Sequence, residues 1–143
     1  MAKRNKFFKQ QPLPLAEQLR QMKLHWPEFS RSIDRSRVSW IGRLTPTEMS
    51  DTYTVRVTYT APLRPVVEVI SPELKGRPGE RIPHTFPGKK LCLHLHEEWD
   101  AANTIIATTV VKWAALWLFF YEAWVITGKW EGGGHEPPTK RGG

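Results

Sequence analysis

The longest apolar stretch of the sequence, residues 104–127, limits the possible folds more than any other feature. It is long enough to cross a bilayer, for which ~20 apolar residues suffice. However, Lys112 lies near its middle and Glu122 near its end, and a lysine at the centre of a membrane span costs roughly 2.5–3.5 kcal/mol on insertion scales. We therefore predict the central core helix of a folded domain and no membrane contact.

Capping residues predict where this helix begins and ends. Asp100 or Asn103 has the side chain of an N-cap, and Gly128 is a typical helix stop, so the helix is expected from about 103 to 127. A second helix is expected near the N-terminus, where apolar residues recur at i, i+4, i+7 and i+11 before Pro27. These apolar residues are Leu15, Leu19, Met22 and Trp26.

Three strands are expected between the two helices, at 37–44, 53–59 and 65–70. The second alternates cleanly, and its short connections suit antiparallel hairpins. Residues 71–90 are rich in proline and glycine and are expected to form a loop. The predicted fold class is α+β, with an N-terminal helix, an antiparallel meander sheet and a long core helix.

Length and composition exclude several classes of protein. With 143 residues the chain suits one domain and is too short for a TIM barrel or a two-domain dinucleotide enzyme. The single cysteine, Cys92, excludes an intramolecular disulfide and a four-cysteine zinc site. No secretory h-region is visible near the start, so a cytoplasmic location is expected. We divide the chain into a basic arm at 1–12, a domain at 13–130 and a Gly/Pro-rich tail at 131–143.

Cys92 is the first candidate for chemistry. Positive charge nearby activates a thiol as a nucleophile, and the preceding loop carries four basic residues: Arg77, Arg81, Lys89 and Lys90. His84, His94 and His96 are also close in sequence. In an extended segment, Cys92, His94 and His96 share one face and the three leucines at 91, 93 and 95 share the other. The alternative is that Cys92 is a small buried hydrophobe.

A metal site is the second candidate. Cys92, His94 and His96 offer three ligands from one face, and a neighbouring side chain would complete a tetrahedral set. The candidates for that fourth ligand are Glu97, Glu98 and His84. The alternative is a polar edge facing solvent, and between the two we predict no bound metal.

The net charge of +7 suits an anionic partner. The arm from Lys3 to Lys9 mixes basic and aromatic residues, but it comes with no nucleic-acid-binding motif, so no specific nucleic-acid partner is predicted. The glycines at 132–134 do not open a helix, so they lack the context of a phosphate-binding loop. We predict no cofactor.

Two groups of motifs resemble a known family. One runs from Pro83 to Leu93 around Cys92 and continues with Trp99 and the helix residues Ile105 and Ile106. The other comprises the first two strands and the tail, at residues 40–46, 53–57 and 127–135. Together they resemble a ubiquitin-conjugating enzyme domain, most closely the bacterial versions found in cyclic-oligonucleotide antiphage signalling (CBASS) operons.

This resemblance implies a fold and an activity. Cys92 would accept a carboxyl group as a thioester, and His84 would match the histidine of the family's His-Pro-Asn signature, which shapes the active-site loop. Thr85 and Phe86 stand where proline and asparagine are usual. A backbone N–H, His94 or His96 would then stabilise the oxyanion, and either histidine is a candidate base for the attacking amine.

The resemblance also implies partners. The chain shows no nucleotide-binding signature, so it needs an activating enzyme or a substrate that arrives activated. In the related systems the conjugated protein is a nucleotidyltransferase of the cyclic-dinucleotide-synthase kind, joined through its C-terminal residue. Two alternatives remain open: a catalytically silent module that binds the synthase, and a Cys/His metal-binding domain. The sequence leaves the oligomeric state open.

Overall fold

The computed structural model describes residues 10–93 and 99–133. The fold is α+β. Its six-stranded antiparallel sheet has the strand order β1-β2-β3-β4-β6-β5. Its elements are α1 (Leu15–His25), β1 (Ser30–Asp34), β2 (Arg37–Leu44), β3 (Tyr53–Thr60), β4 (Val66–Ser71), β5 (Thr85–Phe86), β6 (Lys90–Leu91), the short 3₁₀ helix η2 (Ile106–Thr108) and α2 (Val110–Thr127). The predicted fold class is confirmed at this level.

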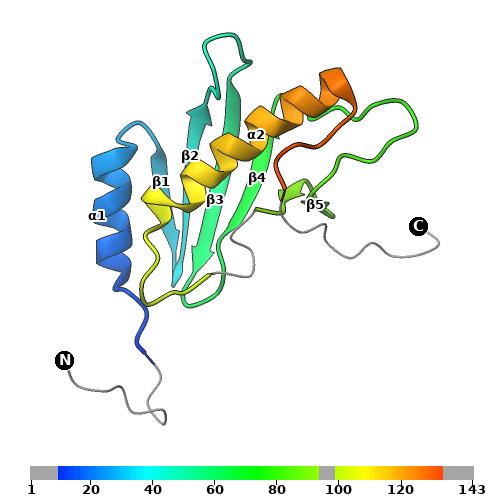
Figure 1. The fold of residues 1–143 in the computed structure, drawn as a ribbon. Helices are drawn as coiled ribbons and strands as arrows, with labels where there is room; N and C mark the ends of the chain where they lie inside the picture. Colours follow the sequence, from blue (N-terminus) through cyan, green and yellow to red (C-terminus); the bar gives the residue numbers. More distant parts are fainter. Residues whose placement is uncertain (1–9, 94–98, 134–143) are drawn as a thin grey trace.

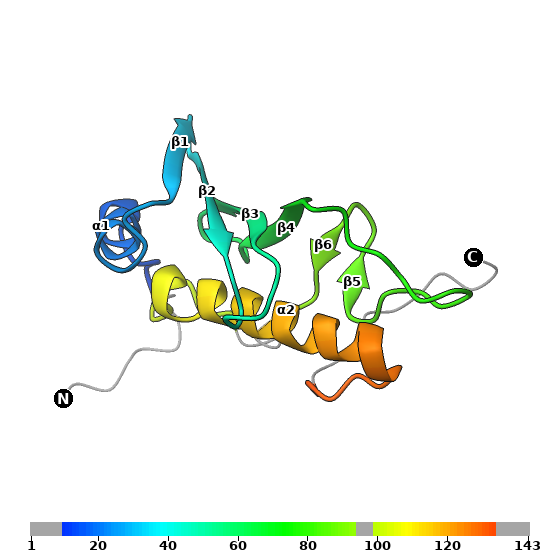
Figure 2. The ribbon, with the colours of Figure 1, turned by 90° about the horizontal axis from the view of Figure 1, so that it is seen from above.

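The core lies between the sheet and α2, which crosses one face of the sheet (Figures 1 and 2). Alternate residues of β2 and β3 are buried against the helix, as the alternation in the sequence predicts. The helix contributes seven buried side chains to the core: Val110, Val111, Ala114, Trp117, Leu118, Tyr121 and Trp124. The prediction of a central core helix is therefore confirmed. By length and composition the segment Ile106–Thr127 also qualifies as a membrane span, a test that soluble core helices pass as well.

The predicted start of the core helix is wrong. Helix α2 begins at Val110, and η2 precedes it. Asp100 does accept hydrogen bonds from the residues that follow it, but in a tight turn and not at the start of a helix. Its carboxylate accepts one from the Ala102 backbone N–H at 3.0 Å and one from the Asn103 side-chain amide at 2.7 Å. Such Asx turns use the same side chains as helix caps, so the sequence pattern does not separate the two. The predicted stop at Gly128 is confirmed, with φ of 80°.

Three of the six strands, β1, β5 and β6, were not predicted from the sequence. All five residues of β1 are exposed, so it has no apolar alternation to reveal it. It joins β2 through a two-residue turn in which Arg35 has φ of 58°, a place where asparagine or glycine is usual. Strands β5 and β6 fall within or at the end of the stretch expected to be a loop, and each has two residues.

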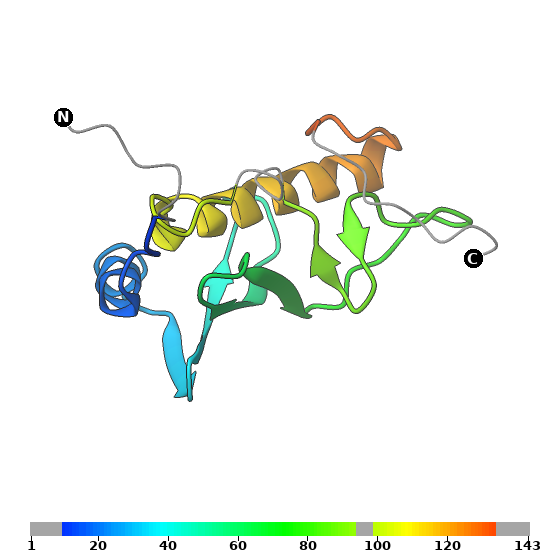
Figure 3. The ribbon, with the colours of Figure 1, turned by 90° about the horizontal axis from the view of Figure 1, so that it is seen from below.

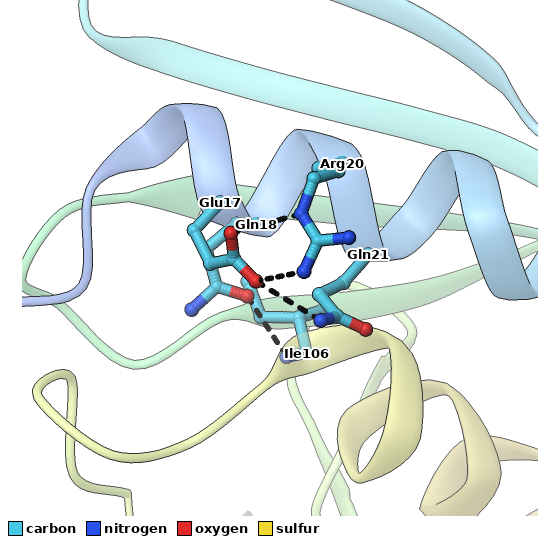
Figure 4. Close-up of polar contacts among 5 residues, drawn as sticks. All are labelled: Glu17, Gln18, Arg20, Gln21 and Ile106. Atoms are coloured by element: carbon cyan, nitrogen blue, oxygen red, sulfur yellow. Dashed lines mark hydrogen bonds and ion pairs between the residues drawn. The ribbon is translucent and has the colours of Figure 1, made fainter.

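Helix α1 lies beside the sheet, next to the start of the α2 segment (Figures 1 and 3). Its fully buried Gln18 makes the connection. The Gln18 amide donates to the Thr104 carbonyl at 2.8 Å, and its oxygen accepts from the Ile106 N–H at 3.0 Å (Figure 4). Both backbone groups precede α2 and have no backbone hydrogen-bond partner within the described helices and strands. The Gln18 side chain satisfies both of them.

A second polar contact ties α2 to β3. The Glu122 carboxylate accepts from the Tyr53 hydroxyl at 2.7 Å and from the Ser50 hydroxyl at 2.6 Å. Burial, and then the hydrogen bond to Glu122, hold the pKa of Tyr53 well above its usual value. Glu122 therefore has a structural role in the folded domain.

We expect Tyr53→Phe to lower the free energy of unfolding by about 1–2 kcal/mol near neutral pH, because a hydrogen bond to a carboxylate is lost. In the wild type the folded state keeps the phenol neutral, whereas the unfolded state ionises above pH ~10. Tyr53 thus contributes stability that is present below that pH and is lost as pH rises. Urea titrations at neutral and alkaline pH should show a smaller alkaline loss in the variant. An equal loss in both proteins would contradict this.

Candidate active site

Cys92 directly follows β6, at the end of the sheet that α2 crosses. Its backbone N–H donates to the His84 carbonyl at 2.9 Å. The same carbonyl accepts from the indole Nε1 of Trp117 at 3.0 Å. The His84 carbonyl therefore joins the loop before β5, the cysteine and helix α2 in one arrangement.

His84 has an unusual backbone conformation. Its φ is +53°, in the left-handed region that non-glycine residues seldom adopt. This conformation lets its carbonyl meet both Cys92 and Trp117 while its ring packs on Trp130, with ring centroids 4.9 Å apart. Non-glycine residues in this region occur often at functional sites, where the surrounding contacts hold them.

Aromatic side chains surround Cys92, which is only 4% exposed. The space next to it is small, with a volume of about 40 Å³. Its described lining residues are His84, Cys92, Trp113, Leu116, Trp117, Phe120, Trp130, Gly132 and Gly133. The thiol thus lies in an aromatic slot that has no room for a peptide.

The loop cations expected beside the thiol lie elsewhere. None of Arg77, Arg81, Lys89 and Lys90 is among the described residues that line the slot. Arg77 pairs with Glu80 and donates to a carbonyl at the end of α2, and Arg81 donates to the Thr85 carbonyl. Lys90 lines a different groove. The structure therefore does not place these four side chains in the wall of the slot.

The alternation around Cys92 is confirmed as far as the structure describes it. Leu91 and Leu93 belong to the hydrophobic core and line a groove of about 320 Å³, whereas Cys92 faces the aromatic slot. His94 and His96 lie outside the described residues. Of the four predicted site residues, the structure thus brings together Cys92 and His84.

The metal hypothesis has little support within the described part of the chain. No group of three His, Cys, Asp or Glu side chains there could hold a metal ion. The ligand set of Cys92, His94 and His96, with Glu97 or Glu98, includes residues outside that part, so it stays a prediction.

Trp130 is the residue of the slot whose place sequence reasoning missed. The sequence pattern indicates only a packing role. In the structure the centroid of its ring lies 5.4 Å from that of Trp117 and 6.2 Å from that of Phe120, so the chain beyond α2 forms one wall of the slot. The signal in the sequence is its position just beyond a helix stop, which lets the chain turn back over the helix.

The comparison with curated proteins returned no match. The family model described as "Type II CBASS E2 protein" matches residues 18–137 of the 143-residue chain. The match covers most of α1, the whole sheet, Cys92 and α2, and it agrees with the resemblance of the motifs around Cys92. The chain therefore belongs to the type II CBASS E2 protein family, whose members have an E2-like role in CBASS defence.

Proposed function

We propose that this protein has a ubiquitin-conjugating-like fold and that Cys92 carries an acyl group as a thioester before passing it to an amine. The observation that carries the proposal is the 2.9 Å hydrogen bond from the Cys92 N–H to the His84 carbonyl. It joins the two residues around which the E2-like motif is built. In this proposal His84 is a positioning residue that fixes the backbone of the nucleophile.

The chemistry needs two steps. In the first, the Cys92 thiolate attacks an activated acyl carbonyl, a C–S bond forms, and the activating group leaves with the electron pair of its bond to the acyl carbon. In the second, a neutral amine attacks the thioester carbonyl, a C–N bond forms, and the C–S bond breaks to return the thiolate. The amine loses its proton to a base, for which His94 and His96 are candidates.

In this proposal the oxyanion is not stabilised by the asparagine of the His-Pro-Asn signature of ubiquitin-conjugating enzymes. Thr85 and Phe86 replace the usual proline and asparagine, and both belong to strand β5. The Cys92 N–H is engaged by the His84 carbonyl. We therefore assign the oxyanion donor to His94, His96 or another backbone N–H, since any well-placed donor serves.

We infer that the acyl donor is the C-terminus of the cyclic-nucleotide synthase of the same operon. Family membership supports an interaction with that synthase. The donor arrives as a thioester of an activating enzyme or in another activated form. The charge of +7 favours an acidic surface on the partner.

The burial of Cys92 favours a second candidate function. Cys92 is only 4% exposed, so its thiol is poorly placed to meet a protein tail. A buried cysteine of this kind suits a catalytically silent module that only binds the synthase. The two candidates differ in one observable: the transferase forms a covalent adduct at Cys92, and the silent module forms only a non-covalent complex.

Co-expression of the protein with the neighbouring genes of its operon tests the proposal, by native mass spectrometry without reductant. We expect an adduct of protein size that neutral hydroxylamine and dithiothreitol both release and that acid leaves intact. Hydroxylamine cleaves a thioester but not a disulfide, so it identifies the bond. The Cys92→Ala variant, in which the adduct must be absent, is the control.

Two outcomes would overturn the proposal. A synthase complex of unmodified masses, with full function of Cys92→Ala in defence, would establish the silent module. An increment of zinc mass that is lost on acidification, with no protein adduct, would favour the metal-binding domain.

A further inference from the structure

The segment 129–133, which we call the strap, contributes to the wall of the slot beside Cys92. Helix α2 ends at Thr127, and Gly128 in the left-handed conformation reverses the chain, with its N–H donating to the Trp124 carbonyl at 2.7 Å. The chain then turns back beneath the end of α2 toward β5 (Figure 1). Three residues of the strap line the slot of Cys92: Trp130, Gly132 and Gly133.

The side chain of Trp130 makes the aromatic contacts between the strap and the body of the domain. The Trp130 ring packs against those of His84, Trp117 and Phe120. The hydrogen bonds of the strap that the described structure shows are local: Lys129 with the Thr127 hydroxyl, and the Trp130 indole with the Gly133 carbonyl at 3.3 Å. Packing is therefore the main interaction that holds the strap to the domain.

Glycine at position 132 allows the close fit. A Cβ placed on Gly132 would lie 2.6 Å from Cδ2 of Phe120 and 3.0 Å from Nε1 of Trp130. A contact as short as that with Phe120 is essentially never seen in real structures, so the strap or the Phe120 ring must shift to admit a side chain at position 132. Glu131, by contrast, is exposed. Neighbouring positions of the strap therefore differ sharply in their tolerance of a side chain.

We propose that the strap is a displaceable cover of Cys92, which must leave the slot before an acyl donor can reach the thiol. The slot offers about 40 Å³, too little for a peptide tail, and part of its wall is the strap itself. If the strap moves away, Trp130, Gly132 and Gly133 no longer line the slot and that wall is open. The relevance of the cover to acyl transfer rests on the proposed function, while the cover itself is a property of the folded chain.

Thiol alkylation tests the cover without any transfer reaction. We expect the full-length Gly132→Val variant to react with N-ethylmaleimide at Cys92 at least ten times faster than the wild type, because the new side chain cannot fit beside Phe120. The matched control is Glu131→Val, which places the same side chain on the neighbouring exposed position. It should react at the wild-type rate.

A rate for Gly132→Val equal to that of the wild type, with the fold intact, would overturn the proposal. Equal acceleration by Glu131→Val would also overturn it, since the effect would then not come from the contact of the strap with Phe120. Near-ultraviolet circular dichroism and a cooperative urea transition report whether each variant is folded. If Gly132→Val does not fold, Trp130→Ala replaces it under the same criteria.

The two proposals fail in different ways. If Gly132→Val accelerates alkylation and the co-expressed wild type forms no hydroxylamine-sensitive adduct, the cover stands and the transferase proposal falls. If the adduct forms but alkylation is unchanged in Gly132→Val, the transferase stands and the strap is not a cover.

Discussion

Cys92→Ser is expected to lower the rate of amine conjugation by a factor of ~10³ or more while leaving the fold intact. A serine hydroxyl is a far weaker nucleophile than a thiol at neutral pH, and an oxyester is a far poorer acyl donor to an amine than a thioester. Serine is slightly smaller than cysteine, so the slot formed by Trp113, Trp117 and Phe120 accommodates it. Any acyl group that does reach the serine hydroxyl of this variant remains there.

Two measurements check this prediction. Single-turnover conjugation with the purified synthase and its activating enzyme gives the rate. Intact mass gives the bond: an adduct of Cys92→Ser should survive dithiothreitol, whereas that of the wild type should not. Conjugation by Cys92→Ser or Cys92→Ala at the wild-type rate would show that the only cysteine of the chain takes no part in the reaction.

Gln18→Leu is expected to lower the free energy of unfolding by about 2–4 kcal/mol, the largest effect on stability that we predict. Gln18 has no exposed surface. Leucine is of similar size, so the loss comes from the two backbone groups that lose their partner: the N–H of the buried Ile106 and the carbonyl of the half-buried Thr104. A loss of this size corresponds to a fall in Tm of roughly 5–15 °C for a domain of this length.

Gln21→Leu is the matched control for this experiment. Gln21 lies on the same helix and is partly exposed, and its side-chain amide donates to the Glu17 carboxylate at 3.0 Å (Figure 4). Its replacement should change stability by no more than about 0.5 kcal/mol. Urea titrations followed by tryptophan fluorescence measure both variants. Equal effects would show that the contact between α1 and η2 contributes no more than a surface contact.

Much of the fold could be read from local patterns. Strands β2, β3 and β4 alternate because one face of the sheet packs on α2 and the other does not. Helix α2 is evident from its apolar length, and its end from Gly128. Strand β1 is missed, since it is exposed at every position and depends for its place on pairing with β2. Its five residues carry no trace of that pairing.

The candidate site divides in the same way. Cys92 and His84 are recognisable from a motif of consecutive residues, and both lie at the slot. The surroundings of the thiol were not predictable, because they come from α2 and from the strap, about twenty to forty residues further along the chain. The charges expected around the thiol are near in sequence but pair with other groups.

Periodicity, the glycine at the end of the core helix and one short motif were thus enough to identify the central strands, the core helix and the candidate nucleophile of this chain. Those features depend on the backbone geometry of neighbouring residues, which the order of side chains encodes directly. The aromatic slot that Cys92 and Trp130 both line, and the link from Gln18 to the segment before α2, depend on which distant surfaces meet. Close packing decides such contacts, and it acts between residues that no local pattern relates.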